Sequence, residues 1–243
     1  MVRTHTAATS RRIPAQRLNS RKGRIVVQQR TRVKICGLTR IEDVHCAVRA
    51  GADAIGLVFY PESSRRVDLL QARLLREAVP AFVNVVALFV NPSFDEVQAV
   101  IKQVQPDLLQ FHGDETPEFC ASFNYRYMRA FRVGGPGLET PEAVLASCQA
   151  FRAASAWLFD SYSSGYGGSG LVLDATLLQG IQDAPESRPL VLAGGLTPET
   201  VAASIKAIRP YAVDVSSGVE MAKGIKSAEK IDAFMKAVRG MPV

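Results

Sequence analysis

The chain has 243 residues, of which 47% are apolar, and its formal net charge is +6 at neutral pH. This length suits one large domain, and no stretch approaches the roughly 18 consecutive apolar residues that a membrane-spanning helix requires. The composition therefore excludes an integral membrane protein, and we expect a cytoplasmic protein with a large buried core.

The excess of basic residues is confined to one segment. Residues 1–30 contain eight Arg and Lys and no Asp or Glu, whereas the rest of the chain contains 21 basic and 23 acidic residues. Because this segment is also poor in large apolar side chains, we expect a disordered basic extension. An acid-free, arginine-rich leader is also typical of an organellar transit peptide, which would change the location, and a nucleic-acid-binding arm is a third interpretation.

The first predicted strand is Arg32–Cys36, within the sequence VKICGLT at residues 33–39. Side chains alternate between the two faces of a strand, so Lys34 and Cys36 share one face. Cys36 is the last residue before Gly37, where the strand gives way to a turn. In α/β barrels, functional residues lie at such strand ends.

Seven further strand-like runs follow, separated by helical patterns with apolar residues three and four apart. The eight predicted strands are Arg32–Cys36, Ala54–Phe59, Val85–Val90, Asp107–Phe111, Tyr127–Arg132, Trp157–Asp160, Leu190–Ala193 and Ala212–Val215. This alternation favours an α/β fold, a single-domain (β/α)8 TIM barrel over residues 31–243. An open doubly wound sheet is the alternative that the pattern leaves open.

Several of the predicted helices begin with capping signals. Thr39 with Glu42, and Ser93 with Glu96, fit the capping box. The sequence Thr-Pro-Glu occurs at residues 116–118, 140–142 and 197–199. It places a hydroxyl at the N-cap, a proline at the first helical position and an acid in the first turn. We therefore predict that a helix begins at each of these five places.

Glycine-bearing segments follow the last two predicted strands. Gly194 and Gly195 follow the seventh strand, and Ser216, Ser217 and Gly218 follow the eighth. In barrels, the loops after strands seven and eight commonly bind phosphate through backbone N–H groups, which glycine allows to approach closely. We expect a phosphate site here, although each segment alone also fits an ordinary turn.

A third glycine cluster, SYSSGYGGSG at residues 161–170, follows Asp160. Its small residues fit either a flexible lid or a passive surface loop, and its place beside the expected site favours the lid. Gly168 and Gly170 are its candidate site residues.

Cys36, Asp160 and Asp214 all lie at or next to predicted strand ends, so a closed barrel would bring them to one rim. A thiol and a carboxyl that face each other across a pocket can act as base and acid on one substrate. A buried apolar thiol at Cys36, and a helix N-cap or loop acceptor at Asp160, are the structural alternatives.

Other polar residues near strand ends are also candidates. Of the adjacent Arg65 and Arg66, one is expected to bind an anionic group and the other to be solvated. His112, just past the fourth strand, fits either a hydrogen bond to substrate or a loop-fixing role. The four cysteines stand singly, and no histidine has metal-ligand spacing, so neither a metal site nor a disulfide is predicted.

Eight segments in this order resemble the phosphoribosylanthranilate isomerases, the barrel enzymes of tryptophan biosynthesis. They are VKICGLT, GADAIGLVF, ALFVNP, LLQFHGDE, RAFRV, LFDS with GYGGSG, LAGGLTPETV and AVDVSSGVE. The resemblance covers about residues 32–239 and leaves the basic extension unexplained.

The resemblance implies an Amadori rearrangement of N-(5-phosphoribosyl)anthranilate to 1-(2-carboxyphenylamino)-1-deoxyribulose 5-phosphate, without metal or organic cofactor. It implies that Asp160 is the general acid that protonates the ring oxygen. Cys36 is then the general base that removes the proton from C2′. To act as a base at neutral pH, the thiol would need its pKa lowered, and Lys34 on the same face is a candidate source of the charge.

The resemblance also assigns the binding residues. It implies that Arg65 binds the anthranilate carboxylate and that Asp214 contacts the ribose-derived hydroxyls. From its position past the fourth strand, we also expect His112 among the substrate-binding residues. It implies that the backbone of the glycine loops holds the phosphate, with the Gly168 to Gly170 segment closing over it. The family's usual proline before the binding arginine is Ser64 here, which leaves the choice between Arg65 and Arg66 open.

The expected partner is a small phosphorylated substrate, with no nucleic acid and no membrane, and the expected state is a monomer or homodimer. Another phosphate-binding barrel is the first alternative. An epimerase would need metal-ligating histidines, and indole-glycerol-phosphate synthase would need a lysine and glutamate pair at the rim, for which Lys34 with Cys36 is a poor substitute. A non-enzymatic module that binds through the basic extension is the second alternative.

Overall fold

Eight parallel strands close into a barrel in the computed structural model, which describes residues 30–162 and 173–241. Each strand pairs with its neighbours in sequence, and β8 closes the barrel by pairing with β1. The strands are β1 Arg32–Cys36, β2 Ala54–Val58, β3 Asn84–Phe89, β4 Leu108–Phe111, β5 Tyr127–Val133, β6 Ala156–Ser161, β7 Leu190–Leu192 and β8 Ala212–Val215.

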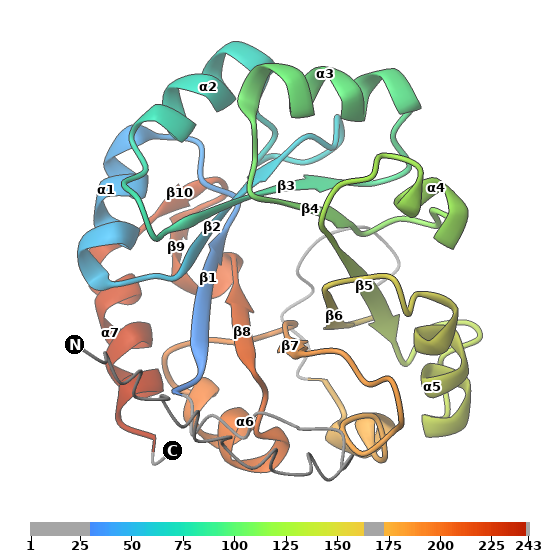
Figure 1. Ribbon diagram of the computed structural model, residues 1–243. Coiled ribbons are helices and arrows are strands. Elements are labelled where there is room, and N and C mark those ends of the chain that lie inside the picture. The colour runs from blue at the N-terminus through green and yellow to red at the C-terminus, as the bar shows by residue number, and fades with distance from the viewer. Residues whose placement is uncertain (1–29, 163–172, 242–243) are drawn as a thin grey trace, which may run out of the picture.

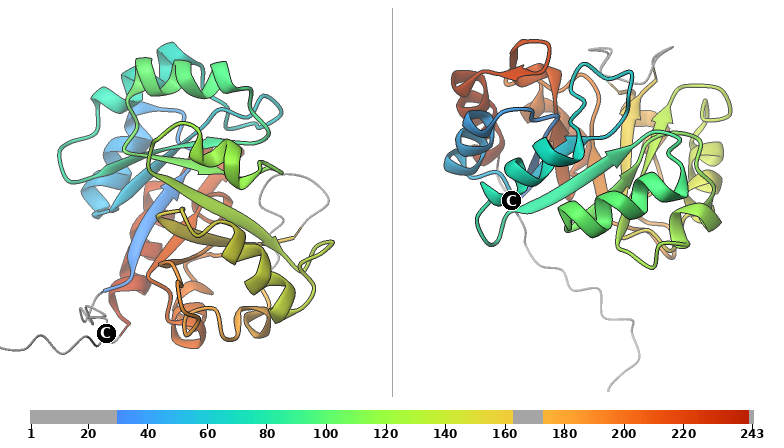
Figure 2. Two further views of the ribbon diagram at one scale, coloured as in Figure 1. Left: turned by 45° about the vertical axis from the view of Figure 1, so that its right-hand side comes forward. Right: turned by 90° about the horizontal axis from the view of Figure 1, so that it is seen from above.

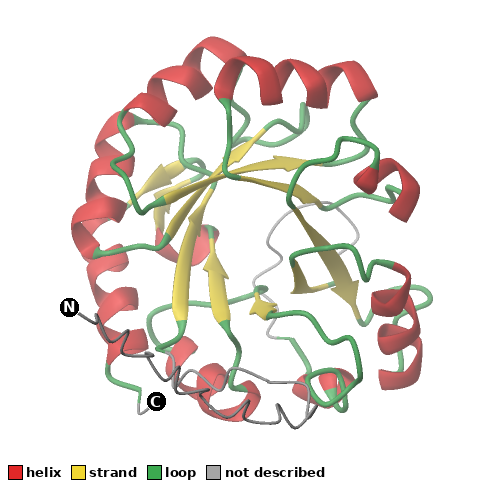
Figure 3. Cartoon of the chain, viewed as in Figure 1, coloured by secondary structure: helices red, strands yellow, loops and turns green. Residues whose placement is uncertain are grey.

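A ring of helices surrounds the strands (Figures 1 and 3). The helices are α1 Ile41–Ala50, α2 Leu69–Glu77, α3 Phe94–Val104, α4 Pro117–Ala121, α5 Pro141–Ala150, α6 Val201–Ile208 and α7 Ala228–Arg239. Two connections depart from the regular pattern. A 3-10 helix, η1 Ala175–Leu178, precedes β7, and β8 is followed by the 3-10 helix η2 Ser217–Val219 and a short hairpin of β9 Glu220–Ala222 and β10 Ile225–Lys226.

The predicted barrel is confirmed, and every observed strand end lies within one residue of its predicted place. Residues 1–29, for which a disordered basic extension was predicted, lie outside the described residues. The same holds for residues 163–172, and therefore for the predicted lid residues Gly168 and Gly170.

Side chains alternate along each strand between two buried regions, one inside the barrel and one between the strands and the helices. On β6, Trp157 and Phe159 face the helices, whereas Leu158 joins a cluster inside the barrel with Met128 and Val191. The larger cluster lies between strands and helices and includes stacked Phe89 and Phe111. Figure 2 shows the helices that cover the strands. Burial of these side chains, at about 25 cal/mol for each Å² removed from water, stabilises the barrel.

Polar residues replace apolar ones at the upper layers of the barrel interior. Lys34, Gln110 and Asp214 are buried there, at 5%, 0% and 8% relative exposure. Burying a polar or charged side chain costs free energy unless it has a partner, and apolar residues at these positions would avoid that cost. Polar residues here therefore point to a functional role and not to a contribution to stability. The barrel therefore positions a polar layer directly beneath its strand ends.

Three of the five predicted helix starts are confirmed. Ser93 forms the complete capping box with Glu96, and the hydroxyls of Thr116 and Thr140 accept from the third backbone N–H of their helices. The start predicted at Thr197 is wrong, since a turn precedes α6, which begins at Val201.

The capping box predicted at Thr39 is also wrong. Helix α1 begins after Arg40, without a side-chain cap. The Thr39 hydroxyl instead donates to the carbonyl of Gly224, 185 residues along the chain, at 2.8 Å. This contact ties the turn after β1 to the hairpin after β8.

Candidate active site

A pocket opens at the C-terminal ends of the barrel strands. Ten of the predicted site residues line it: Cys36, Arg65, His112, Asp160, Gly194, Gly195, Asp214, Ser216, Ser217 and Gly218. They come from the ends of β1, β4, β6, β7 and β8 and from the loop after β2. The structure thus brings together every predicted site residue that it describes.

Cys36 lies on the wall of this pocket. Its side chain faces the barrel interior with Val58, Leu88 and Val90, and the residue is 6% exposed. The opposing residue on β2 is Gly56, where an added Cβ would lie 2.7 Å from Cys36 Sγ and 3.0 Å from Lys34 Nζ. Glycine at this position therefore leaves room for the thiol and the ammonium to meet.

Lys34 and Asp214 form a buried ion pair beneath Cys36. Lys34 Nζ lies 3.0 and 2.9 Å from the two carboxylate oxygens, and the two residues are register partners on β1 and β8. Burial lowers the pKa of Lys34, but the charges of Asp214 and Cys36 outweigh it, and the net shift is upward. Lys34 therefore stays protonated, and its positive charge is shared between a carboxylate and the thiol.

The pKa of the Cys36 thiol is not lowered overall, as its proposed role as a base would require. Burial raises the pKa of Cys36, Lys34 and Lys226 lower it, and the Asp214 carboxylate raises it again, so that the net shift is upward. The sequence indicated Lys34 as the source of positive charge. It could not show that a carboxylate would already engage that charge.

Asp160 is the residue before the last of β6, and it faces His112 across the pocket. His112 Nε2 lies 3.4 Å from Asp160 Oδ2, and His112 Nδ1 lies 3.1 Å from the amide nitrogen of Gln110. If the amide donates to Nδ1, the ring proton is on Nε2 and points at the Asp160 carboxyl. The imidazole is then held from both sides, and it orients Asp160 toward the pocket.

Arg65 points into the pocket, whereas Arg66 is exposed and lines a separate groove beside α2 and α3. Arg65 donates from Nε and Nη2 to the two carboxylate oxygens of Glu220, at 2.7 and 2.8 Å. Lys226 Nζ donates to the same carboxylate at 2.8 Å. This geometry favours Arg65 over Arg66 as the pocket's anion-binding arginine.

Backbone conformation shapes the two glycine loops. Gly194 and Gly195 have φ values of +79° and +61°, which L-residues with a side chain rarely adopt. A Cβ on Gly218 would lie 1.9 Å from the carbonyl oxygen of Leu196, so glycine is required for the loops after β7 and β8 to approach. These loops and the start of η2 together line the pocket.

Three site residues were not singled out from the sequence. Gln110 and Glu220 occur only within the motifs LLQFHGDE and AVDVSSGVE, and Lys226 lies six residues beyond the second motif. A signal did exist for Gln110, since it is the polar residue two before His112 and must share its strand face. For Glu220 no local signal existed, because its partner Arg65 is 155 residues away. Lys226 contacts Glu220 six residues before it, but only the hairpin after β8 brings the two side chains together.

The described residues contain no group of three or more His, Cys, Asp or Glu side chains placed to hold a metal ion. Every helix in the described part of the chain is too short or too polar to pass through a lipid bilayer.

Comparison with known proteins identifies close relatives. A family model described as N-(5'phosphoribosyl)anthranilate (PRA) isomerase matches residues 33–237. The N-(5'-phosphoribosyl)anthranilate isomerase of Bordetella parapertussis is 61% identical over 212 residues, covering 87% of this chain and 97% of the relative. That of Pseudomonas fluorescens strain SBW25 is 50% identical over 210 residues, covering 86% and 95%.

Solved structures agree with these relatives. The phosphoribosyl anthranilate isomerase of Thermotoga maritima superposes with a TM-score of 0.78 at 38% identity, covering 87% of this chain and 100% of that chain. A crystal structure of such an isomerase in complex with reduced 1-(o-carboxyphenylamino)-1-deoxyribulose 5-phosphate gives a TM-score of 0.74 at 35% identity, with the same coverage.

Proposed function

Since the chain belongs to the N-(5'-phosphoribosyl)anthranilate isomerase family, and is an aldose–ketose isomerase of tryptophan biosynthesis, we propose that the pocket at the strand ends is its active site. The observation that carries this proposal is that Cys36 and Asp160 line one pocket together with two glycine loops and an arginine. The reaction converts N-(5-phosphoribosyl)anthranilate to 1-(2-carboxyphenylamino)-1-deoxyribulose 5-phosphate.

In the first step of the proposed mechanism, Asp160 protonates the furanose ring oxygen. The C1′–O bond breaks, and the nitrogen lone pair forms an iminium at C1′. Asp160 suits this role because it lies near the end of β6 at the pocket and His112 holds it from one side. General acid catalysis of this kind contributes about 100- to 10,000-fold in rate.

In the second step, Cys36 removes the proton from C2′. The electrons of that C–H bond move into the iminium, and the resulting enolamine tautomerises to the ketone. The iminium thus accepts the electrons, and we propose that neither metal nor organic cofactor takes part. Lys34 and Lys226 provide the positive charge that favours the thiolate, against the burial of the thiol and the charge of Asp214.

The remaining residues bind the substrate in this proposal. Backbone N–H groups of Gly194, Gly195 and residues 216–218 hold the phosphate, because a loop pair at a short helix start binds anions without a charged side chain. Arg65 binds the anthranilate carboxylate. Asp214, held by Lys34, accepts a hydrogen bond from a substrate hydroxyl.

We also propose that residues 31–243 form the catalytic barrel domain, and that the protein acts in the bacterial cytoplasm, as the curated relatives are bacterial. Its partner is a small phosphorylated molecule and not nucleic acid, since the excess of basic over acidic residues lies in the first 30 positions, outside this domain. A relative from Thermotoga maritima is described as dimeric. We therefore propose that this protein is either a monomer or a homodimer.

Replacement of Asp160 by Asn tests the role of the acid. Asn keeps the size and removes the transferable proton, so we expect kcat to fall about 100- to 10,000-fold with an unchanged fold. The loss of substrate fluorescence on turnover measures kcat, and complementation of a tryptophan auxotroph gives an independent readout. Asp183→Asn, at an exposed position away from the pocket, is the matched control. Normal turnover by Asp160→Asn would remove the assigned role.

A further inference from the structure

Arg65, Glu220 and Lys226 form a cluster beside the pocket, called here the Arg65 cluster. Arg65 donates to both oxygens of Glu220, at 2.7 and 2.8 Å, and Lys226 Nζ donates to one of them at 2.8 Å. Lys226 Nζ also contacts the carbonyl oxygen of Ser216 at 3.1 Å. The three side chains come from the loop after β2 and from the β9–β10 hairpin.

The charges of the cluster do not balance. One carboxylate serves two cations, and all three side chains are largely buried, at 16% exposure for Arg65, 6% for Glu220 and 0% for Lys226. Removing charges from water is costly unless they are paired. Burial lowers the pKa of Lys226, and the Glu220 carboxylate opposes this effect. With Lys226 protonated, the cluster carries one positive charge in excess, which an anion entering from the pocket beside Arg65 would balance.

Arg65 keeps donors free for that anion. A guanidinium has five N–H groups, and Glu220 takes the side formed by Nε and Nη2. The edge formed by Nη1 and the second Nη2 proton has no carboxylate partner among the described residues. This edge matches a second carboxylate with two parallel hydrogen bonds.

The hairpin that carries Glu220 and Lys226 is itself fixed. The backbone N–H of Lys226 donates to Asp43 Oδ2 at 3.2 Å, and Lys230 Nζ donates to the carbonyl oxygen of Glu220 at 2.7 Å. On the other side, a Cβ on Gly37 would lie 2.5 Å from Arg65 Cδ. The absence of a side chain at Gly37 thus lets the arginine stem pass directly beside the end of β1.

We propose that Glu220 is a positioning residue that orients Arg65 for the aryl carboxylate, and that Lys226 supplies the excess positive charge that this carboxylate neutralises. The cluster then sets the preference for substrates with a carboxylate on the ring. This inference rests on the proposed role of Arg65 in substrate binding. A purely structural role, tying the hairpin to the loop after β2, is the alternative.

The test compares Glu220→Gln with wild type in two measurements. The Gln amide keeps one acceptor oxygen, but its nitrogen cannot accept from Arg65 or Lys226, so the two-point contact that orients the guanidinium is lost. We expect KM for the substrate to rise about 10- to 100-fold, with kcat changed less than about threefold. The Kd of the reduced product analogue should rise as much, whereas that of the same analogue without its carboxylate should stay within about twofold.

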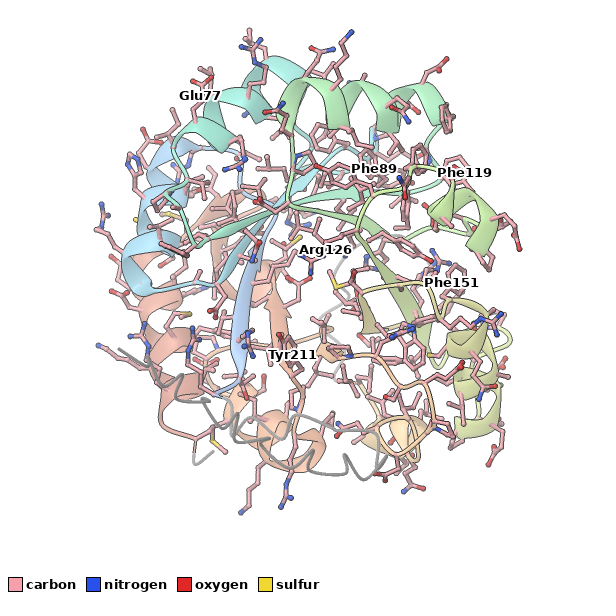
Figure 4. The ribbon with its side chains drawn as sticks, in the orientation of Figure 1. Glu77, Phe89, Phe119, Arg126, Phe151 and Tyr211 are labelled. Atoms are coloured by element: carbon pink, nitrogen blue, oxygen red, sulfur yellow. The ribbon has the colours of Figure 1, made fainter. Side chains whose placement is uncertain are left out.

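Two further variants keep the test decisive. Glu77→Gln, on the outer end of α2 (Figure 4), is the control and should leave both Kd values unchanged. If the two buried cations that Glu220→Gln leaves prevent folding, Glu220→Gln combined with Lys226→Met removes one of them. The Kd of the carboxylated analogue should then rise in the double variant, while that of the analogue without the carboxylate stays within about twofold.

The outcomes separate this inference from the proposed function. An Arg65→Ala variant that binds both analogues as wild type does would contradict the proposed role of Arg65 itself. If Arg65→Ala loses affinity for the carboxylated analogue and Glu220→Gln does not, the positioning role is overturned while the proposed function stands. An equal loss for both analogues in Glu220→Gln would show a structural role only.

Discussion

The Cys36 thiol shows how neighbouring charges set the behaviour of one residue. Burial among Val58, Leu88 and Val90 disfavours the thiolate, and the Lys34 ammonium opposes this effect. Asp214 holds the same ammonium at 2.9 Å and limits its influence on the thiol. A substrate hydroxyl that engages Asp214 would leave more of the lysine charge to the thiolate, at the moment when a base is needed.

Replacement of Lys34 by Met should therefore raise the pKa of Cys36 further. Each unit of increase lowers the thiolate fraction about tenfold at a pH below that pKa. We expect the pH profile of Cys36 alkylation by iodoacetamide to move to higher pH, and kcat/KM at neutral pH to fall about tenfold or more. Mass spectrometry of the Cys36 peptide measures the alkylation.

Two matched variants complete this experiment. Lys206→Met, at an exposed position on α6, should leave the alkylation profile where it is in wild type. Lys34→Met combined with Asp214→Asn removes the carboxylate that the single variant leaves unpaired. A profile that does not move in the single variant would show that Lys34 has no influence on the thiol.

At the scale of elements, the loops after β7 and β8 depend on glycine for their close approach. Gly218→Ala places a Cβ against the Leu196 carbonyl, so the two loops must move apart. We expect KM to rise about tenfold or more, because the backbone N–H groups no longer converge on the phosphate. Inorganic phosphate should also become a weaker competitive inhibitor, which steady-state kinetics will show.

Gly240→Ala is the control for this substitution. Its φ is −71°, and an added Cβ meets its nearest neighbour at 3.4 Å, an ordinary contact distance. Equal inhibition by phosphate in Gly218→Ala and wild type would place the phosphate elsewhere.

Local sequence signals predicted the strands and most helix starts, and they failed where a contact with a distant part of the chain determines the local structure. The strands followed from runs of β-branched and apolar residues, and Ser93 with Glu96 followed from a local capping pattern. Thr39 has the same local pattern as Ser93, but its hydroxyl is engaged by Gly224 from the other end of the barrel. A prediction from local spacing cannot include such a contact.

The same distinction applies to the site. Strand ends placed Cys36, Asp160 and Asp214 at one rim, because a barrel brings all strand ends together. The pairing of Lys34 with Asp214 and of Arg65 with Glu220 depends on barrel closure and on the hairpin after β8. The residues of the site could therefore be predicted from the sequence, but the ion pairs between them could not.

For the whole molecule, buried thiols link stability to alkaline pH. Burial raises the pKa of Cys120 to about 12 and also raises that of Cys148, and both residues lie in the core between strands and helices. Between the thiol pKa of the unfolded chain and that of the folded chain, only the unfolded state loses its proton. The free energy of unfolding therefore falls as pH rises above about 8.5, by about 2 kcal/mol for each thiol at pH 10.

Urea unfolding at pH 7.5 and pH 10 measures this decrease. In the Cys120→Ala and Cys148→Ala double variant the starting stability is lower, because two cavities form, but the decrease between the two pH values should be smaller by about 4 kcal/mol. An undiminished decrease would mean that other groups cause the alkaline loss.

The central claim is that Cys36 removes the proton from C2′, and turnover of the Cys36→Ala variant tests it most directly. Cys46→Ala, at a half-buried thiol on α1, is the matched control, and both proteins are assayed by the loss of substrate fluorescence. We predict that kcat of Cys36→Ala falls about 100- to 10,000-fold while its fold and that of the control are kept, and that Cys46→Ala turns over as wild type does. Turnover by Cys36→Ala within a few-fold of wild type would contradict the assignment.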